Sequence, residues 1–333
     1  MNRNYGLFGL AKASASAPAV DFPASASSAG IDAAVSNEAV RVTNGARDTT
    51  VGRYITGTDS TASVTTLAFP KAVGMMLYAA LGSDSVSRVG STDYYTHDIT
   101  MAQALPELNF FQQVGSSSAA MQKLAKAKVS SLNISAEGVT PPAVTMEMTG
   151  TEATWLPTTT WSGPGDAMDE WFTSAGATVL LALSGDEPGA VPAYIALNSL
   201  ECTIDSPLTA MRKFGSVSAS EVADGACTVS VSLSGTCSDT KVYRIVKTGT
   251  ESGTDVSSTI LTGALQVTFP HISDDDQSLV LKFPAIPWNC EALNVDVEGG
   301  PFDLTLSTDG AIAEDGTSIE VLLTNKQTTA YSA

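Results

Sequence analysis

Basic residues are scarce in this sequence. It contains 17 lysines and arginines against 35 aspartates and glutamates, which gives a formal net charge of −18 at pH 7. A surface that carries its share of this charge repels the phosphates of nucleic acid. The composition therefore argues against a protein that grips DNA or RNA, although an acidic surface is also expected of a protein that only needs to stay soluble.

Cysteine and histidine are also rare. A Cys227–Cys237 disulfide is conceivable because these residues flank one predicted strand, but small buried thiols in a reducing cytosol are the favoured state. Two histidines are too few for a His-rich metal site, and we assign them no role. All the cysteines lie in the second half without C-x-x-C spacing: Cys202, Cys227, Cys237 and Cys290.

The motifs of enzymes and membrane proteins are missing as well. No segment approaches the roughly 20 apolar residues that span a bilayer, and there is no P-loop, dinucleotide fingerprint or G-x-S-x-G motif. Residues 238–241 and 247–249 read SDTK and KTG, which are parts of the signature of penicillin-recognising serine enzymes. The two lie too close together and lack the Ser-Asp-Asn between them. We therefore predict no enzyme activity, no cofactor and no metal site.

The N-terminal stretch MNRNYGLFGLAKASASAPA imitates a secretory signal. Its apolar run, residues 5–11, is short, and Lys12 interrupts the segment directly after it, so we interpret residues 1–34 as an extended N-terminal arm. From residue 11 onward the arm is too poor in large apolar side chains to order itself. We expect another surface to hold it, with a neighbouring subunit as the natural candidate.

Strand-like segments dominate the rest of the chain. Residues 35–152 include GRYITG, ASVTTLAF, YYTHDIT, ELNFFQQV, KVSSLNISAE and AVTMEMTG. Pro70 and Gly82 are natural start and stop signals for one short helix between them. This helix is apolar nearly all round, which predicts burial on more than one side. Its Met75 and Met76 are candidate contacts between subunits.

A second block, residues 194–326, repeats this order. Its helix is expected over residues 238–248, with Ser238 and Asp239 at the N-terminus and an amphipathic pattern that leaves the lysines and arginine at a wetter surface. Each block has strands, one helix and then four strands, with a histidine after the helix. This order favours internal duplication, against the alternative that many all-β proteins look self-similar.

The two blocks predict an all-β fold with minor α content. We expect two tandem β-sandwich domains, residues 35–152 and 194–326, each with one short flanking helix, followed by a C-terminal tail at 327–333. Residues 153–193 between them contain Trp155, Trp161 and Trp171, which predicts an ordered excursion with a helical turn over 166–172. The tryptophans are further candidate contacts.

One basic cluster stands out in the acidic chain. We expect its lysines to pair with an acidic surface on a neighbouring copy or to form an exposed edge that discourages unwanted pairing. The cluster occupies the stretch MQKLAKAK and consists of Lys123, Lys126 and Lys128.

The order of these segments resembles a known family. GRYITGTDSTASVTTLAFPKAVGMMLYAALG, YYTHDITMAQALPELNFFQQV and AKVSSLNISAEGVTPPAVTMEMTGTEA are similar to the major tail tube protein of long, non-contractile-tailed bacteriophages. The resemblance covers residues 53–153 and continues more loosely through NSLECTIDS, CTVSVSLSGT and SIEVLLTN. These patterns are not catalytic signatures, so their specificity comes from their order.

The resemblance implies a structural virion protein that self-assembles into stacked rings around a β-lined channel for the genome. The implied partners are other copies of the chain, the tape measure protein and DNA in the lumen, and terminator and tail-tip proteins at the tube ends. Assembly would take place in the host cytoplasm, without membrane insertion. An acidic lumen would let DNA pass without sticking.

Two sandwiches in one chain would let three chains form a pseudo-sixfold ring, which we favour over a hexamer with the second block outside. The alternative function is a secreted adhesin or surface-layer protein with Ig-like domains.

Overall fold

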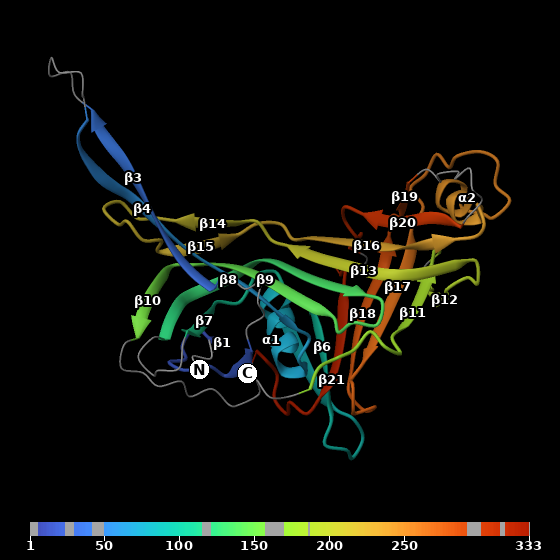
Figure 1. Cartoon of the computed structure of the whole chain (residues 1–333), viewed down its shortest axis with the longest axis horizontal. Helices are drawn as coiled ribbons and strands as arrows, with labels where there is room; N and C mark the ends of the chain where they lie inside the picture. The colour runs from blue at the N-terminus through green and yellow to red at the C-terminus, as the bar shows by residue number, and fades with distance from the viewer. Residues whose placement is uncertain are drawn as a thin grey trace, which may run out of the picture.

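The computed structural model describes residues 6–23, 30–41, 50–114, 121–156, 170–185, 187–291, 301–313 and 317–332. It confirms an all-β fold with minor α content: two large sheets enclose one helix, and a second helix lies at one end of the molecule (Figure 1).

The larger sheet has 12 strands among the described residues. It consists of β1 (Gly6–Lys12), β2 (Val20–Pro23), β3 (Gly30–Arg41), β4 (Thr50–Leu67), β7 (Leu108–Val114), β8 (Met121–Glu137), β9 (Ala143–Gly150), β10 (Glu152–Leu156), β13 (Ile195–Asp205), β16 (Thr228–Cys237), β19 (Asn289–Cys290) and β20 (Phe302–Thr308). Long strand β8 bends the sheet, because its first part pairs with β7 and β10 and its second part with β9 and β13.

The smaller sheet has seven strands in the described part of the chain. They are β5 (Gly82–Arg88), β6 (Tyr95–Met101), β11 (Thr178–Ala182), β12 (Gly189–Ala190), β17 (Gly263–Pro270), β18 (Ser278–Ile286) and β21 (Glu320–Asn325). A separate hairpin, β14 (Leu208–Met211) and β15 (Glu221–Asp224), extends from the ends of β13 and β16. Strand β5 is not among the predicted strands, because its polar residues follow the helix without a break.

Helix α1 (Pro70–Leu81) has the bounds that its sequence predicts. Pro70 begins it, and Gly82 ends it in the left-handed conformation (φ 97°), with its N–H donated to the Tyr78 carbonyl. The helix is buried along nearly its whole length between β8 of the larger sheet and β5, β6 and β21 of the smaller one. Burial on both sides is what its all-round apolar character requires.

Helix α2 (Lys241–Thr248) begins three residues later than expected. The Asp239 carboxylate accepts the Lys241 N–H at 3.0 Å, so Asp239 shapes a turn ahead of the helix instead of lying inside it. Val242 and Val246 are buried and Arg244 is exposed, as the amphipathic pattern predicts.

The hydrophobic core draws on both predicted blocks. One cluster contains Leu77 and Ile134 from the first block together with Leu233 and Phe283 from the second. Both sheets also cross the boundary, because β13 pairs with β8 and β21 pairs with β6. The division into two tandem β-sandwich domains, residues 35–152 and 194–326, stays a prediction. All four cysteines are free thiols, so Cys227 and Cys237 form no disulfide.

The expectation that a neighbouring subunit holds the N-terminal arm is wrong for residues 6–23. Strand β1 pairs with β2 and β7 of its own chain. Phe8, Leu10 and Phe22 are buried, and the Phe8 ring stacks on Phe110 with 5.4 Å between ring centroids. The apolar residues of GLFGLAK do not alternate, so no local strand pattern marks β1.

Candidate assembly surface

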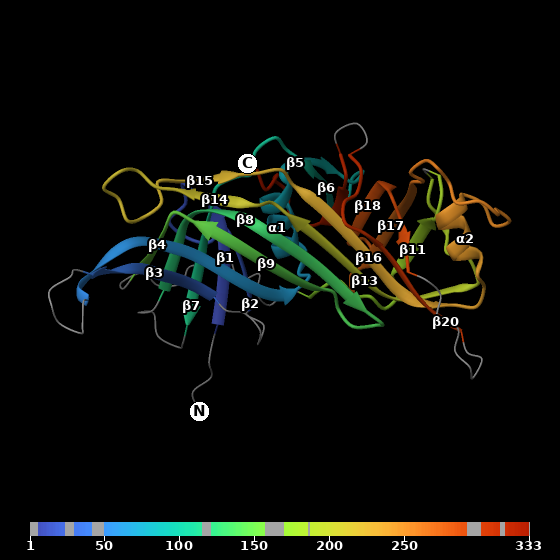
Figure 2. The ribbon, with the colours of Figure 1, turned by 90° about the horizontal axis from the view of Figure 1, so that it is seen from above.

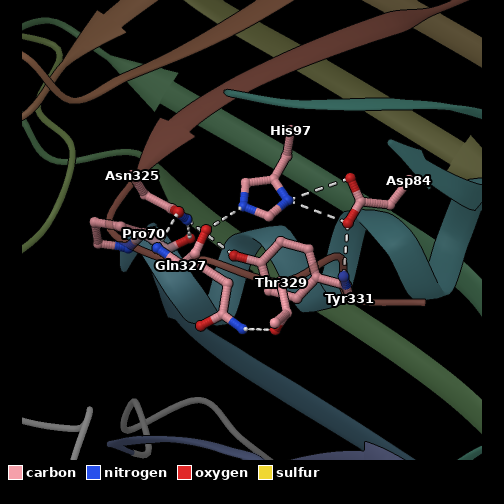
Figure 3. Close-up of polar contacts among 7 residues, drawn as sticks. All are labelled: Pro70, Asp84, His97, Asn325, Gln327, Thr329 and Tyr331. Atoms are coloured by element: carbon pink, nitrogen blue, oxygen red, sulfur yellow. Dashed lines mark hydrogen bonds and ion pairs between the residues drawn. The ribbon is translucent and has the colours of Figure 1, made fainter. Parts of the chain in front are cut away.

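The most enclosed group of titratable side chains lies where the C-terminal segment crosses helix α1 (Figure 3). His97 of β6 is fully buried, and its Nδ1 lies 3.1 Å from the Asp84 carboxylate of β5. Its Nε2 lies 3.0 Å from the Gln327 carbonyl oxygen. Both ring nitrogens thus lie within hydrogen-bonding distance of acceptor oxygens.

Tyr331 completes this cluster. Its N–H donates to Asp84 at 2.6 Å, its ring lies 4.8 Å from the His97 ring, and its hydroxyl accepts a hydrogen bond from Asn325 at 2.9 Å. Because the His97 and Asp84 side chains are both fully buried, no substrate can reach them. The cluster fastens the chain end to the fold, a role that no sequence pattern indicates for His97.

Figure 2 shows the strands of the larger sheet running side by side. Their side chains form a polar face opposite the core. Along β4, β8, β9, β13, β16 and β20, apolar side chains alternate toward the core with small polar ones toward solvent. We call these outward side chains the polar face: Thr61, Ser63, Thr65, Ser131, Asn133, Ser135, Glu137, Thr145, Glu147, Thr149, Glu201, Thr203, Asp205, Ser230, Ser232, Ser234, Thr236, Asp303, Thr305 and Ser307.

Strand register places these residues side by side across the sheet. Asn133 of β8 lies opposite Thr203 of β13 and donates hydrogen bonds to Thr203 and Glu201, each at 2.8 Å. Thr65 and Thr145 share a hydrogen bond of 3.0 Å between β4 and β9. The polar face therefore continues without interruption from the first block into the second.

The charge of the polar face is entirely negative. Its five ionisable side chains are the carboxylates of Glu137, Glu147, Glu201, Asp205 and Asp303. Lys128, which the register sets opposite Thr149, is buried. At its margin Lys128 bonds the Asp224 carboxylate at 2.5 Å, and this hydrogen bond lowers the pKa of Asp224. A broad surface of hydroxyl groups and carboxylates offers an anionic polymer nothing to bind. The alternation in KVSSLNISAE and TVSVSLSGT is the sequence signal for this face.

In the described residues, four strands of the larger sheet each pair with a single neighbour: β2, β3, β10 and β19. Two of these edges, the long strand β3 and the short strand β19, are unlike. At one edge the 12-residue strand β3 pairs, within the described residues, only with β4. The β3–β4 hairpin projects from the body (Figure 1). Its exposed side chains include Val35, Tyr54 and Ile55. At another edge, β20 pairs with β16 on its inner side. On its outer side it pairs with the two-residue strand β19 in the part of the chain that the structure describes. A long exposed edge strand is a template for pairing with another chain.

The order of strands recurs within the larger sheet. Across the sheet, strands β3, β4, β9 and β8 lie side by side in that order, and β13, β16, β20 and β19 follow them. Every adjacent pair is antiparallel. Helices α1 and α2 follow the second strand of each set. The match is incomplete, because β21, the last strand of the second block, lies in the smaller sheet whereas β9 lies in the larger.

The methionines predicted as contacts between subunits do not lie at the surface. Met75 and Met76 are buried in the core of their own chain, at 3% and 0% exposure. This prediction is wrong, because the two sheets of one chain already cover both sides of α1.

The basic cluster is divided by an irregularity of β8 at Lys126, whose φ is positive at 47°. Lys128 is buried against Asp224, so it is not available to a neighbouring copy. Lys126 is exposed, and the Lys123 ammonium lies 6.0 Å from the Phe111 ring centroid. Strand β8 lies inside the sheet, so the cluster does not protect an edge.

The tryptophans also separate. Trp155 of β10 is 64% exposed, whereas Trp171 packs edge-on against Phe69 with ring centroids 6.3 Å apart. Trp161 and most of the helical turn predicted over 166–172 lie outside the described residues. Of this set, only Trp155 presents a large apolar surface in the described part of the chain.

Other kinds of site find no candidate in the described part of the fold. The described residues contain no cluster of histidine, cysteine, aspartate and glutamate able to hold a metal ion, and none of their helices is long and apolar enough to cross a membrane. No protein-family model matches the sequence, and no curated protein matches it significantly.

Proposed function

We propose that this chain is a structural protein that assembles through two edges of its larger sheet into rings, and that stacked rings form the tail tube of a long-tailed bacteriophage. The observation that carries this proposal is the larger sheet, which combines a wide hydroxyl-rich face carrying carboxylates with the unlike edges β3 and β19–β20. Pairing of unlike edges is head-to-tail, and such an interface closes into a ring when the rotation between copies allows it.

The contact between β8 and β13 suggests how neighbouring copies would join. It links the last strand of the first set to the first strand of the second, antiparallel, over residues 131–137 and 199–205. If the β19–β20 edge of one copy meets β3 of the next in the same way, the polar face becomes the inner wall of a closed barrel. The core then lies outside that wall.

Three copies of the eight ordered strands would give a barrel of 24 strands. With strands about 4.8 Å apart and tilted by about 40°, such a barrel is roughly 48 Å across between backbones. This leaves a wide lumen lined by short side chains. A hexamer of the same sheet would give a barrel about twice as wide. We favour the trimeric ring, whose lumen is the narrower of the two.

The channel fits the passage of DNA. Carboxylates repel phosphates, and Lys128, the lysine set opposite Thr149, is buried against Asp224 and not offered to DNA. Tape measure protein and DNA would occupy the lumen in turn, and terminator and tail-tip proteins would cover the β-edges and loops at the tube ends. We place the protein in the virion after assembly in the host cytoplasm.

A pair of proline substitutions tests the edge contact. In an edge strand, neighbouring N–H groups point alternately to the paired strand and to the open side. Of Ala33→Pro and Ala34→Pro in β3, one therefore disrupts pairing with β4, and the other blocks only the open edge.

We expect the open-edge variant to keep the circular dichroism spectrum and unfolding midpoint of the unmodified chain but to form no rings in negative-stain electron microscopy. If both variants form rings as the unmodified chain does, or if that chain forms none under any assembly condition, the proposal is wrong.

A further inference from the structure

The β14–β15 hairpin ends in an exposed turn that is both apolar and basic. Phe214 is fully exposed at 110%, and Met211 is 51% exposed. Arg212 and Lys213 lie between them, in a chain with few basic residues. We call residues 211–217 the basic tip. A fully exposed phenylalanine leaves a large apolar area in water, which is typical of a binding site.

The basic tip is braced against the β3–β4 hairpin. The Arg212 guanidinium bonds the Asp59 carboxylate, and it also donates to the Thr58 carbonyl at 3.3 Å. The Thr58 N–H donates to the Val217 carbonyl at 2.8 Å. Because these contacts already fix the turn, a partner can bury Phe214 with little further ordering of the chain.

A complementary surface follows helix α2. In residues 249–262 Val256 is 74% and Ile260 78% exposed, and the charged residues are Glu251 and Asp255, with no lysine or arginine. We call this segment the acidic loop. It is also braced, because Glu251 lies 3.3 Å from the Lys241 ammonium and the Ser257 N–H donates to the Lys247 carbonyl at 2.9 Å.

The two surfaces lie at opposite ends of the molecule, so one chain cannot join them (Figure 1). We infer that the basic tip of one copy binds the acidic loop of the next, with Phe214 against Val256 and Ile260 and with Lys213 facing Asp255. This contact joins copies end to end. It uses residues other than the β-edges but lies beside them, because the basic tip is bonded to β4 and α2 contacts β19. It rests on the proposed function, because it assumes that copies of this chain assemble.

Cysteine pairs test the contact directly. In a Cys227→Ser background, which leaves only buried native thiols, a Phe214→Cys chain is mixed with an Ile260→Cys chain under mild oxidation. We expect a disulfide-linked dimer from this mixture. The matched control replaces the second chain by Ile272→Cys, an isoleucine 50% exposed elsewhere on the molecule, and should give none. Equal yields, or no dimer in the first mixture, overturn the inference.

Charge reversal gives a second readout. Lys213→Glu or Asp255→Lys alone should weaken end-to-end association by about twofold to fivefold in sedimentation velocity, as expected for a charge pair at a rim. Both changes in one chain should restore it. If rings form normally and neither Lys213→Glu nor Asp255→Lys weakens association, the contact between the basic tip and the acidic loop is wrong, and the proposed function is not affected. Absence of rings from the unmodified chain contradicts the proposed function, and the cross-link still reports on the contact.

Discussion

At the scale of single residues, burial decides which charged groups matter. His97 and Asp84 lie at 0% side-chain exposure, whereas Arg88 and Asp93 form an ion pair at 49% and 97%. An exposed pair contributes little because water screens it, but removing one partner of a buried hydrogen-bonded pair leaves buried polar groups without that hydrogen bond.

We therefore expect His97→Leu to lower the free energy of unfolding by about 3 kcal/mol, because Asp84 and the Gln327 carbonyl lose their shared partner. Arg88→Ala is the control and should cost at most about 0.5 kcal/mol. Urea unfolding followed by circular dichroism measures both. Equal losses would mean that the buried cluster does not hold the chain end.

The same contrast applies to the basic cluster. Lys128→Met leaves the Asp224 carboxylate without its 2.5 Å partner and should cost about 2 kcal/mol. Lys126→Met, on the exposed neighbouring lysine, should be nearly neutral. Thermal unfolding of the two variants under identical conditions compares their midpoints. A larger loss for Lys126→Met than for Lys128→Met would refute the stabilising role of the Lys128–Asp224 pair.

Asp274 should make stability depend on acid pH. Burial opposes its ionisation, but hydrogen bonds from Lys326, Gln277 and Tyr94 prevail and lower the pKa of Asp274 to about 2. The ionised form therefore stabilises the fold above the unfolded-state pKa near ~3.9, and this contribution is lost as pH falls toward 2.

The variant Asp274→Asn should accordingly be less stable than the unmodified chain by about 1 kcal/mol at pH 6, and the difference should shrink between about pH 4 and pH 2. Urea unfolding at a series of pH values measures it. A difference that stays constant across this range would exclude the titration of Asp274 as its cause.

At the scale of elements, helix α1 shows how tertiary packing overrides intrinsic preference. Glycine normally weakens a helix relative to alanine. At Gly74, however, an added Cβ would overlap the Tyr331 hydroxyl oxygen, far inside van der Waals contact. The glycine is there because the C-terminal segment crosses the helix at this point.

We predict that Gly74→Ala lowers the unfolding free energy by about 1–3 kcal/mol instead of raising it. In a Tyr331→Leu background, which lacks the hydroxyl, the same change should cost much less. A double-mutant cycle from urea unfolding measures this coupling. Additive effects would show that the two residues do not compete for this space.

The sequence predicts some elements better than others. Helix α1 and strands β6 to β9 are predictable because proline, glycine and apolar alternation act locally. Strand β1 and the His97 cluster are not, because their partners lie far along the chain: β7 for the former and Gln327 for the latter. The polar face is visible as alternation, but its continuity depends on the β8–β13 register, which no local pattern specifies.

At the scale of the whole molecule, the two blocks behave as one body with two faces. The smaller sheet and the core lie on one side of the larger sheet, and the acidic polar face lies on the other. Five carboxylates gather on this face: Glu137, Glu147, Glu201, Asp205 and Asp303. We propose that this face is the wall of a channel.

A cryo-electron microscopy top view of the assembled chain tests this central claim most directly. We predict closed rings of three copies, with the strands of the larger sheet forming one continuous barrel and Glu147, Glu201 and Asp303 facing its lumen. Rings whose polar face points outward, or particles that remain single chains under every assembly condition, would contradict it.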